Sequence, residues 1–146
     1  MMQITIKGFK NGERIPDQYT CKGIDLQPTV EIEDVPEGTK SVVLIMDDPD
    51  APHGTFTHWI AYNIPPDIHS IEHSRHSEIS FGINDFGNEG YNGPCPPHGK
   101  SHRYYFRAYA TTIEHMQKSL HAKPVIDKLK NSVIETAEYM GTYSND

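Results

Sequence analysis

Apolar and polar residues alternate along much of this chain, and this period of two predicts β-strands. Short alternating segments lie at residues 3–7 and 30–32, and longer ones lie at residues 57–64 and 101–111. Residues 41–46, with the sequence SVVLIM, form an unbroken apolar run that is rich in β-branched side chains. Such a run is typical of a strand that is covered on both faces. The pattern therefore predicts a mainly β domain, with mostly turns and loops between the two long segments.

The alternation also assigns the side chains of the two long strands to faces. In the first long strand, one face is expected to carry His58, Ile60, Tyr62 and Ile64. In the second, one face is expected to carry His102, Tyr104, Phe106, Ala108 and Ala110. Each strand thus begins with a histidine whose face continues into apolar positions.

A second periodicity near the C-terminus predicts a helix over residues 124–140. Apolar side chains recur there at spacings of three and four, which places them on one helical stripe. Pro124 suits the first turn of a helix, and Gly141 suits the left-handed position just after its end. Because one apolar stripe must be covered, we expect the helix to dock on the sheet. The prediction is a β-sandwich with a C-terminal helix, in a single domain over residues 1–146.

Composition narrows the classes of partner and location. The chain has a formal net charge of -7 at pH 7, and an acidic surface repels nucleic acids and anionic bilayers. We therefore expect no nucleic-acid partner. No apolar segment is long enough for a signal peptide or an integral membrane segment. The two cysteines, Cys21 and Cys95, are too few for a disulfide framework, which predicts free thiols and a cytoplasmic protein.

Two stiff loops lead into the histidines that begin the long strands. Residues 46–57 (MDDPDAPHGTFT) follow the apolar run and precede His58. Residues 90–101 (GYNGPCPPHGKS) precede His102. If the strands are neighbours, the two imidazoles and the carboxylate of Asp48 converge on a pocket with proline walls.

A pocket of this composition suits the capture of a small anion. Imidazole N–H groups donate hydrogen bonds to phosphate or carboxylate oxygens, and Asp48 can hold one imidazole in a single tautomer. Prolines lose little further entropy on ordering, so such a wall is preformed. The sequence offers no nucleophile in a recognisable context and no phosphate loop at a helix start. We therefore expect a binding protein that is not an enzyme and uses no cofactor and no metal.

Plainer interpretations compete for the same residues. Segments rich in Asp and Pro form turns for backbone reasons, and a single histidine is most often structural. A zinc site is a weak interpretation for two sets, Cys95 with His98 and His102, and His69 with His73 and His76. Intervening prolines and the lack of a fourth ligand weaken the first set, and a solvated loop is preferred for the second. Cys95 with His98 or His102 could also be a thiol nucleophile and its base, but no third residue orients them and no helix N-terminus lowers the thiol pKa, so an inert thiol is preferred.

The motifs in the two loops resemble those of a known family. DPDAP followed by HW, and GPCPPHG followed by HRYYF, are similar to motifs of the phosphatidylethanolamine-binding protein family in its shorter prokaryotic form. The resemblance covers most of the chain and implies an antiparallel β-sandwich with a small anion-binding cavity near one end. Cys95 stands at a position that is often glycine in the animal members. The family's cavity residues correspond here to Asp48, Asp50, His58, Gly93, Pro96, Pro97, His102 and Tyr104.

The resemblance also suggests functions. Members of this family are associated with binding phospholipid head groups and with inhibiting serine proteases or kinases. We therefore expect a protein that binds a small anion or a phospholipid head group such as phosphoethanolamine, and that acts as a regulator. The alternative is a protein-interaction module that inhibits a serine protease or modulates a kinase. Related prokaryotic proteins make a homodimer a further expectation.

Overall fold

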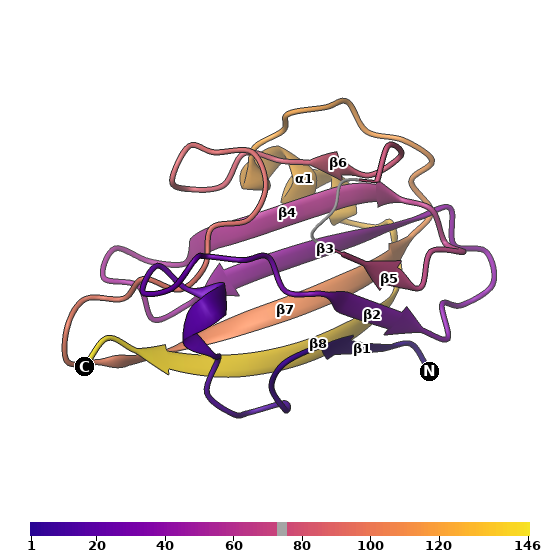
Figure 1. Cartoon of the computed structure of the whole chain (residues 1–146). Helices are drawn as coiled ribbons and strands as arrows, with labels where there is room; N and C mark the ends of the chain where they lie inside the picture. Colours follow the sequence, from indigo (N-terminus) through magenta and orange to yellow (C-terminus); the bar gives the residue numbers. More distant parts are fainter. Residues whose placement is uncertain (73–75) are drawn as a thin grey trace.

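Two antiparallel sheets and one α-helix make up the computed structural model, which describes residues 1–72 and 76–146 (Figure 1). The larger sheet has the strand order β6-β4-β3-β7-β8, with bounds Ser80–Phe81, Phe56–Ile64, Ser41–Asp48, Ser101–Thr111 and Val133–Ser144. The smaller sheet has the order β1-β2-β5, with bounds Gln3–Ile6, Val30–Glu33 and Ser70–Ile71. The remaining elements are the 3-10 helix η1, Asp17–Tyr19, and the helix α1, Ala122–Leu129. The prediction of a mainly β sandwich with one helix is confirmed.

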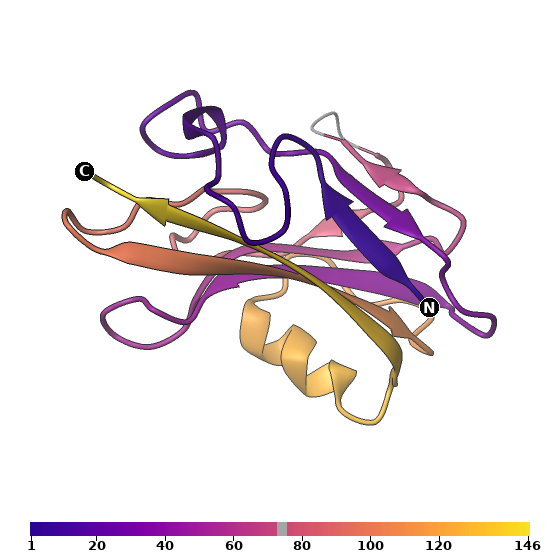
Figure 2. The ribbon, with the colours of Figure 1, turned by 90° about the horizontal axis from the view of Figure 1, so that it is seen from below.

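The larger sheet lies in the middle of the molecule and is covered on both sides. Figure 2 shows α1 on one side of it and the smaller sheet on the other. Leu44 and Met46 of β3 face the smaller sheet, whereas Val43 and Ile45 face the helix side with Val125. This double coverage explains why residues 41–46 are apolar without alternation.

The predicted helix over residues 124–140 is wrong in its extent. Helix α1 ends at Leu129, and Asn131 has a left-handed backbone with a φ of 67°. Residues from Val133 onward form β8, which pairs with β7 along almost its whole length. The apolar residues of this segment fit a period of two as well, because alternate positions are buried from Ala137, through Tyr139 and Gly141, to Tyr143. Pairing with a complete neighbouring strand outweighed the helical pattern.

Gly141 has a different role from the predicted helix end. It lies inside β8, where a Cβ atom would come within 2.5 Å of Ile15 Cγ1 and 2.6 Å of Phe9 Cε2. Across the same contact, the Ile15 N–H donates a backbone hydrogen bond to the Thr142 carbonyl, and the Thr142 N–H donates one to the Glu13 carbonyl. The glycine therefore allows the segment before η1 to cross close over the edge strand.

A β-bulge in β4 changes the face that His58 occupies. Met46 pairs with Trp59, but the next residue, Asp47, pairs with Thr57, so His58 is an extra residue on its strand. Bulges re-aim side chains and are common beside functional sites. The prediction that His58 shares a face with Ile60 and Tyr62 is wrong, because those two face α1 whereas His58 packs against Tyr104 on the other face. The predicted face of β7, from His102 to Ala110, is buried as expected.

Candidate anion-binding cavity

A cavity of about 220 Å³ lies at the end of the larger sheet where β3 ends and β4 and β7 begin. The loop from β3 to β4 and the loop before β7 lie at this end of the molecule (Figure 1). The two stiff loops of the sequence thus reach one place because β3 is paired with both β4 and β7. The lining residues are Asp48, Ala51, Pro52, Phe56, His58, Phe86, Cys95, Pro96, Pro97, His102 and Tyr104.

Asp48 and His102 form a buried pair in the wall of the cavity. His102 Nδ1 lies 2.7 Å from Asp48 Oδ2, and both side chains are 4% exposed. The other carboxylate oxygen, Oδ1, accepts a 2.8 Å hydrogen bond from the backbone N–H of Asp50. Since a carboxylate accepts hydrogen bonds, Nδ1 of His102 carries the proton. The pair fixes the ring orientation and leaves Nε2 of His102 for a ligand.

The second histidine is held by a backbone carbonyl. His58 Nδ1 lies 2.8 Å from the carbonyl oxygen of Asn92, so this nitrogen donates its proton to that oxygen. Edge-to-face contacts surround the ring, with centroid distances of 5.1 Å to Phe56, 5.4 Å to Phe86 and 5.3 Å to Tyr104. Burial lowers the pKa of His58 below its ordinary value, despite the Asn92 carbonyl and the nearby Asp48 charge. The neutral ring therefore presents Nε2 with a lone pair.

The lowered pKa of His58 predicts a loss of stability on acidification. Between its lowered folded pKa and the ordinary value of 6.5, the unfolded chain binds a proton that the folded chain does not. The free energy of unfolding therefore falls as the pH falls through this window, by at most about 1.4 kcal/mol for each pH unit. Urea unfolding at pH 7.5 and pH 5.5 measures this fall. The variant His58→Gln should show a smaller fall, and an equal fall in both proteins would contradict the assignment to His58.

Tyr104 supplies a buried hydroxyl group between the two histidines. Its oxygen is buried without a hydrogen-bond partner of acceptable geometry within the described residues. The ring lies against His58 on one side and is stacked on His102 at a centroid distance of 6.4 Å. Burial and the Asp48 carboxylate raise the pKa of the Tyr104 hydroxyl, which therefore keeps its proton at neutral pH. A ligand in the cavity can satisfy this unpaired group.

Two of the expected cavity residues shape the walls without lining the cavity. Asp50 is engaged by Arg103, whose Nε and Nη2 donate hydrogen bonds of 2.9 and 2.8 Å to the two carboxylate oxygens. These bonds lower the pKa of Asp50 to about 2 and tie the β3–β4 loop to β7. Gly93 donates a 2.9 Å hydrogen bond from its N–H to Asp25 Oδ1 and lies against the backbone of Tyr19. Both residues position the loops.

Several lining residues were missed from the sequence. Phe86 has an exposed fraction of 47% and stands at the cavity with no motif around it to reveal it. Phe56 lies two residues before His58 in the first loop, and this spacing was the signal in the sequence that could have revealed it. The Asn92 carbonyl is a backbone group, which no side-chain pattern reveals.

The prediction of free thiols is wrong. Cys21 and Cys95 form a disulfide, with their Cα atoms 5.4 Å apart and 74 positions apart in sequence. The pairing arises because the segment after η1 lies against the loop before β7, a contact that spacing in the sequence does not reveal. The argument for a reducing compartment therefore loses its basis, and Cys95 is neither an inert thiol nor a free thiolate for zinc.

The predicted solvated loop with His69, His73 and His76 is only partly visible, since His73 lies outside the described residues. His76 is exposed, and the backbone carbonyl of His69 accepts a 2.9 Å hydrogen bond from the N–H of Ile32 in β2. Within residues 1–72 and 76–146, no group of three or more His, Cys, Asp or Glu residues is arranged to hold a metal ion. In that same part of the chain, no helix is long and apolar enough to cross a membrane.

Fold and site define a class of protein: a two-sheet β domain with one helix and a small histidine-lined cavity at one end of its larger sheet. Residues 5–144 match the family model described as phosphatidylethanolamine-binding protein. The chain belongs to this family. A UPF0098 protein from Aquifex aeolicus is 46% identical over all of this chain and 90% of its own length. The UPF0098 protein PH1269 from Pyrococcus horikoshii is 44% identical over 92% of this chain and 73% of its own.

Solved structures of two relatives agree with this placement. A homologue of phosphatidylethanolamine-binding protein from Chlamydia trachomatis superposes with a TM-score of 0.92 at 37% identity, over 99% of this chain and 98% of its own. E. coli YbcL, described as a member of the mammalian PEBP family, gives a TM-score of 0.91 at 31% identity over 99% of both chains. The resemblance seen in the two loop motifs is thereby confirmed over the whole fold.

Proposed function

We propose that this protein binds a small phosphate-bearing anion, such as a phospholipid head group, in the cavity, without chemical turnover. The observation that carries the proposal is that three polar groups, each able to make a further hydrogen bond, converge on the cavity. They are Nε2 of His58, Nε2 of His102 and the unpartnered hydroxyl of Tyr104. The lining carboxylate, Asp48, is occupied by His102 and the Asp50 N–H, so its charge is partly offset where an anion would lie.

The protonation states suggest how a phosphate would be held. Tyr104 donates its hydroxyl proton to a phosphate oxygen, which also relieves an unpaired buried group. A phosphate monoester has a second pKa of about 6 and so carries a proton in part of its population near neutral pH. That proton can be shared with the Nε2 lone pair of neutral His58, while Nε2 of His102 faces the same ligand because Asp48 holds the ring through Nδ1. Phe56, Phe86 and the three prolines of the wall enclose the site and leave room for a small head group.

A titration tests the proposal. The ring signals of the nine histidines, followed by NMR near pH 6 as phosphate or phosphoethanolamine is added, should shift selectively at His58 and His102. His98 is exposed and lies in the loop before β7 but outside the cavity lining, so it serves as an internal control. The proposal is abandoned if no imidazole moves selectively.

Replacement of His102 should weaken binding strongly. His102→Ala removes one polar group that contacts the anion and leaves the buried Asp48 carboxylate without its partner, so the phosphate affinity should fall by about tenfold or more. Isothermal titration calorimetry measures the change, with His98→Ala as the matched control that should bind like the parent. Equal affinities of the parent and His102→Ala would remove His102 from the site.

Tyr104→Phe should separate binding from stability. The change removes a buried hydroxyl that lies beside the Asp48 carboxylate but makes no hydrogen bond of good geometry, so the free energy of unfolding should change by no more than about 1 kcal/mol. The phosphate affinity should nevertheless fall by about threefold to tenfold, because one hydrogen bond to the ligand is lost. Calorimetric titration and urea unfolding of the same variant check both halves. An unchanged affinity would place the ligand away from this hydroxyl.

Regulation of a kinase, inhibition of a serine protease and a homodimer stay predictions of the family resemblance. The residues that line the cavity provide no argument for or against these three roles. The experiments above address the cavity alone.

A further inference from the structure

We propose that the Cys21–Cys95 disulfide is a redox-sensitive clamp on the cavity wall, and that its reduction by a dithiol weakens the binding of the anion. This inference rests on the proposed function and names a means of regulating the same site. Cys95 lines the cavity, and its partner Cys21 belongs to the segment that follows η1. The disulfide is therefore a covalent link between the cavity wall and a segment outside it.

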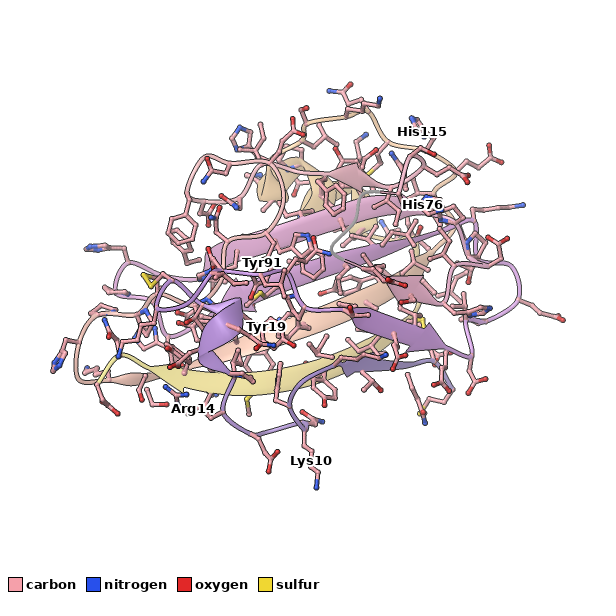
Figure 3. The ribbon with its side chains drawn as sticks, in the orientation of Figure 1. Lys10, Arg14, Tyr19, His76, Tyr91 and His115 are labelled. Carbon is pink, nitrogen blue, oxygen red and sulfur yellow. A yellow bond between two sulfur atoms is a disulfide. The ribbon has the colours of Figure 1, made fainter. Side chains whose placement is uncertain are left out.

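The loop before β7 is well anchored only on one side of Cys95. Upstream, Gly93 N–H donates to Asp25, and the Tyr91 hydroxyl donates a 2.7 Å hydrogen bond to the carbonyl of Tyr19. Figure 3 labels both residues, with Tyr91 next to Tyr19 at the end of η1. These bonds hold the part of the loop that also supports His58 through Asn92.

Downstream of Cys95 the hydrogen bonds from residues 96–99 to the rest of the described chain are few and long, although Pro96 is buried. Pro96 and Pro97 have no backbone N–H group and cannot donate hydrogen bonds. The Pro96 carbonyl accepts a bond of 3.4 Å from the Asn145 side chain, and the Gly99 N–H donates one of 3.3 Å to the Asn145 carbonyl. Asn145 is the penultimate residue of the chain. The disulfide is therefore the short tie that holds residues 95–97 against the cavity.

Both half-cystines are exposed to solvent, so a dithiol can reach the bond. A thiolate of the dithiol attacks one sulfur, forms a mixed disulfide and releases the other cysteine as a thiol. The second thiol of the reductant then attacks the reductant sulfur of the mixed disulfide and displaces the remaining cysteine as a thiol, giving a cyclic disulfide. Two electrons and two protons pass from the dithiol to Cys21 and Cys95. Exposed disulfides undergo this exchange more readily than buried ones.

Loss of the clamp should affect one wall of the cavity more than the other. The wall formed by residues 95–97 would become mobile, and a ligand would have to order it on binding. Ordering costs roughly threefold to tenfold in affinity for one immobilised group. The Asp48–His102 pair and the His58–Asn92 bond do not depend on the disulfide, so the polar groups of the site should remain in place.

The test compares three samples: the oxidised protein, the same protein reduced with dithiothreitol, and the double variant Cys21→Ser/Cys95→Ser. Inorganic phosphate is the probe, its affinity is measured by calorimetry, and the histidine ring signals are recorded by NMR without ligand. We expect the dissociation constant to rise about threefold to tenfold on reduction and in the double variant. Dithiothreitol should have no effect on the double variant, and reoxidation of the parent should restore tight binding.

Three other results are possible, and each would overturn a specific part of the proposal. Equal affinities in the oxidised and reduced states would overturn the clamp while leaving the anion site intact. Failure of both states to bind phosphate would overturn the proposed function, and the regulation of binding with it. Loss of the native histidine signals on reduction would show that the disulfide holds the whole fold, which would also overturn a clamp confined to the wall.

Discussion

Replacement of Gly93 by alanine is expected to destabilise the protein by about 3 kcal/mol or more and to disrupt the cavity. A Cβ atom at this position would lie 1.9 Å from the carbonyl oxygen of Tyr19 and 2.5 Å from Asp25 Oδ1. The nearest obstacle is backbone, which cannot rotate away as a long side chain can. The loop before β7 would have to move away from the segment around η1.

That movement would reach the binding site through defined contacts. The hydrogen bond from Gly93 to Asp25 would break, and the adjacent Asn92 carbonyl would shift away from His58. Phosphate affinity should therefore fall together with stability, and both are measured on the same variant by calorimetric titration and urea unfolding.

Gly87→Ala is the matched control for Gly93→Ala. Gly87 has a positive φ of 88°, but a Cβ atom there would meet nothing within 4 Å. The substitution strains the backbone only, which costs about 1 kcal/mol. A cost at Gly93 no greater than the cost at Gly87 would show that the two segments separate freely, and the close contact would then have no part in supporting the site.

The sequence predicted the strands well where their pattern is local. The β7 prediction matches the observed bounds, Ser101–Thr111, because its alternation is regular and one face is buried throughout. The run at residues 41–46 was assigned correctly to a strand covered on both faces. In both cases the pattern of apolar residues within the strand itself is enough to predict the strand and its buried faces.

The errors arose where distant parts of the chain decide the outcome. Residues 133–140 fit a helix and a strand almost equally, and only pairing with β7 selects the strand. The face of His58 depends on a bulge that shows itself only in the register between β3 and β4. The disulfide joins the segment after η1 to the loop before β7, and these two segments, distant in sequence, lie side by side only in the folded chain, where the Cys21 N–H also donates to the Pro94 carbonyl.

The candidate site shows the same division. The two loop motifs contained Asp48, His58 and His102, and the structure brings these three together around one cavity. Asp50 belongs to the first loop motif, but its carboxylate is hydrogen-bonded to Arg103 of β7. A motif thus indicates which residues surround a site, whereas their separate roles follow from partners that only the folded chain supplies.

Removal of the disulfide is expected to lower the free energy of unfolding by about 4 kcal/mol, the largest effect predicted for this chain. The bond closes a loop between residues 74 positions apart. In the chain-entropy description, the cross-link restricts the unfolded chain, and the restriction grows with the logarithm of loop length. Urea unfolding of the oxidised protein and of Cys21→Ser/Cys95→Ser measures the difference.

The denaturant dependence identifies the state on which the disulfide acts. If the cross-link mainly compacts the unfolded chain, its removal exposes more surface on unfolding and the slope of free energy against urea concentration should increase. A reduction in stability below about 1 kcal/mol with an unchanged slope would contradict the loop-entropy account. With a folded stability of typically 5–15 kcal/mol, a domain can lose about 4 kcal/mol and still remain folded. The disulfide can then be reduced in the native protein, which is the condition that a redox clamp on the cavity wall requires.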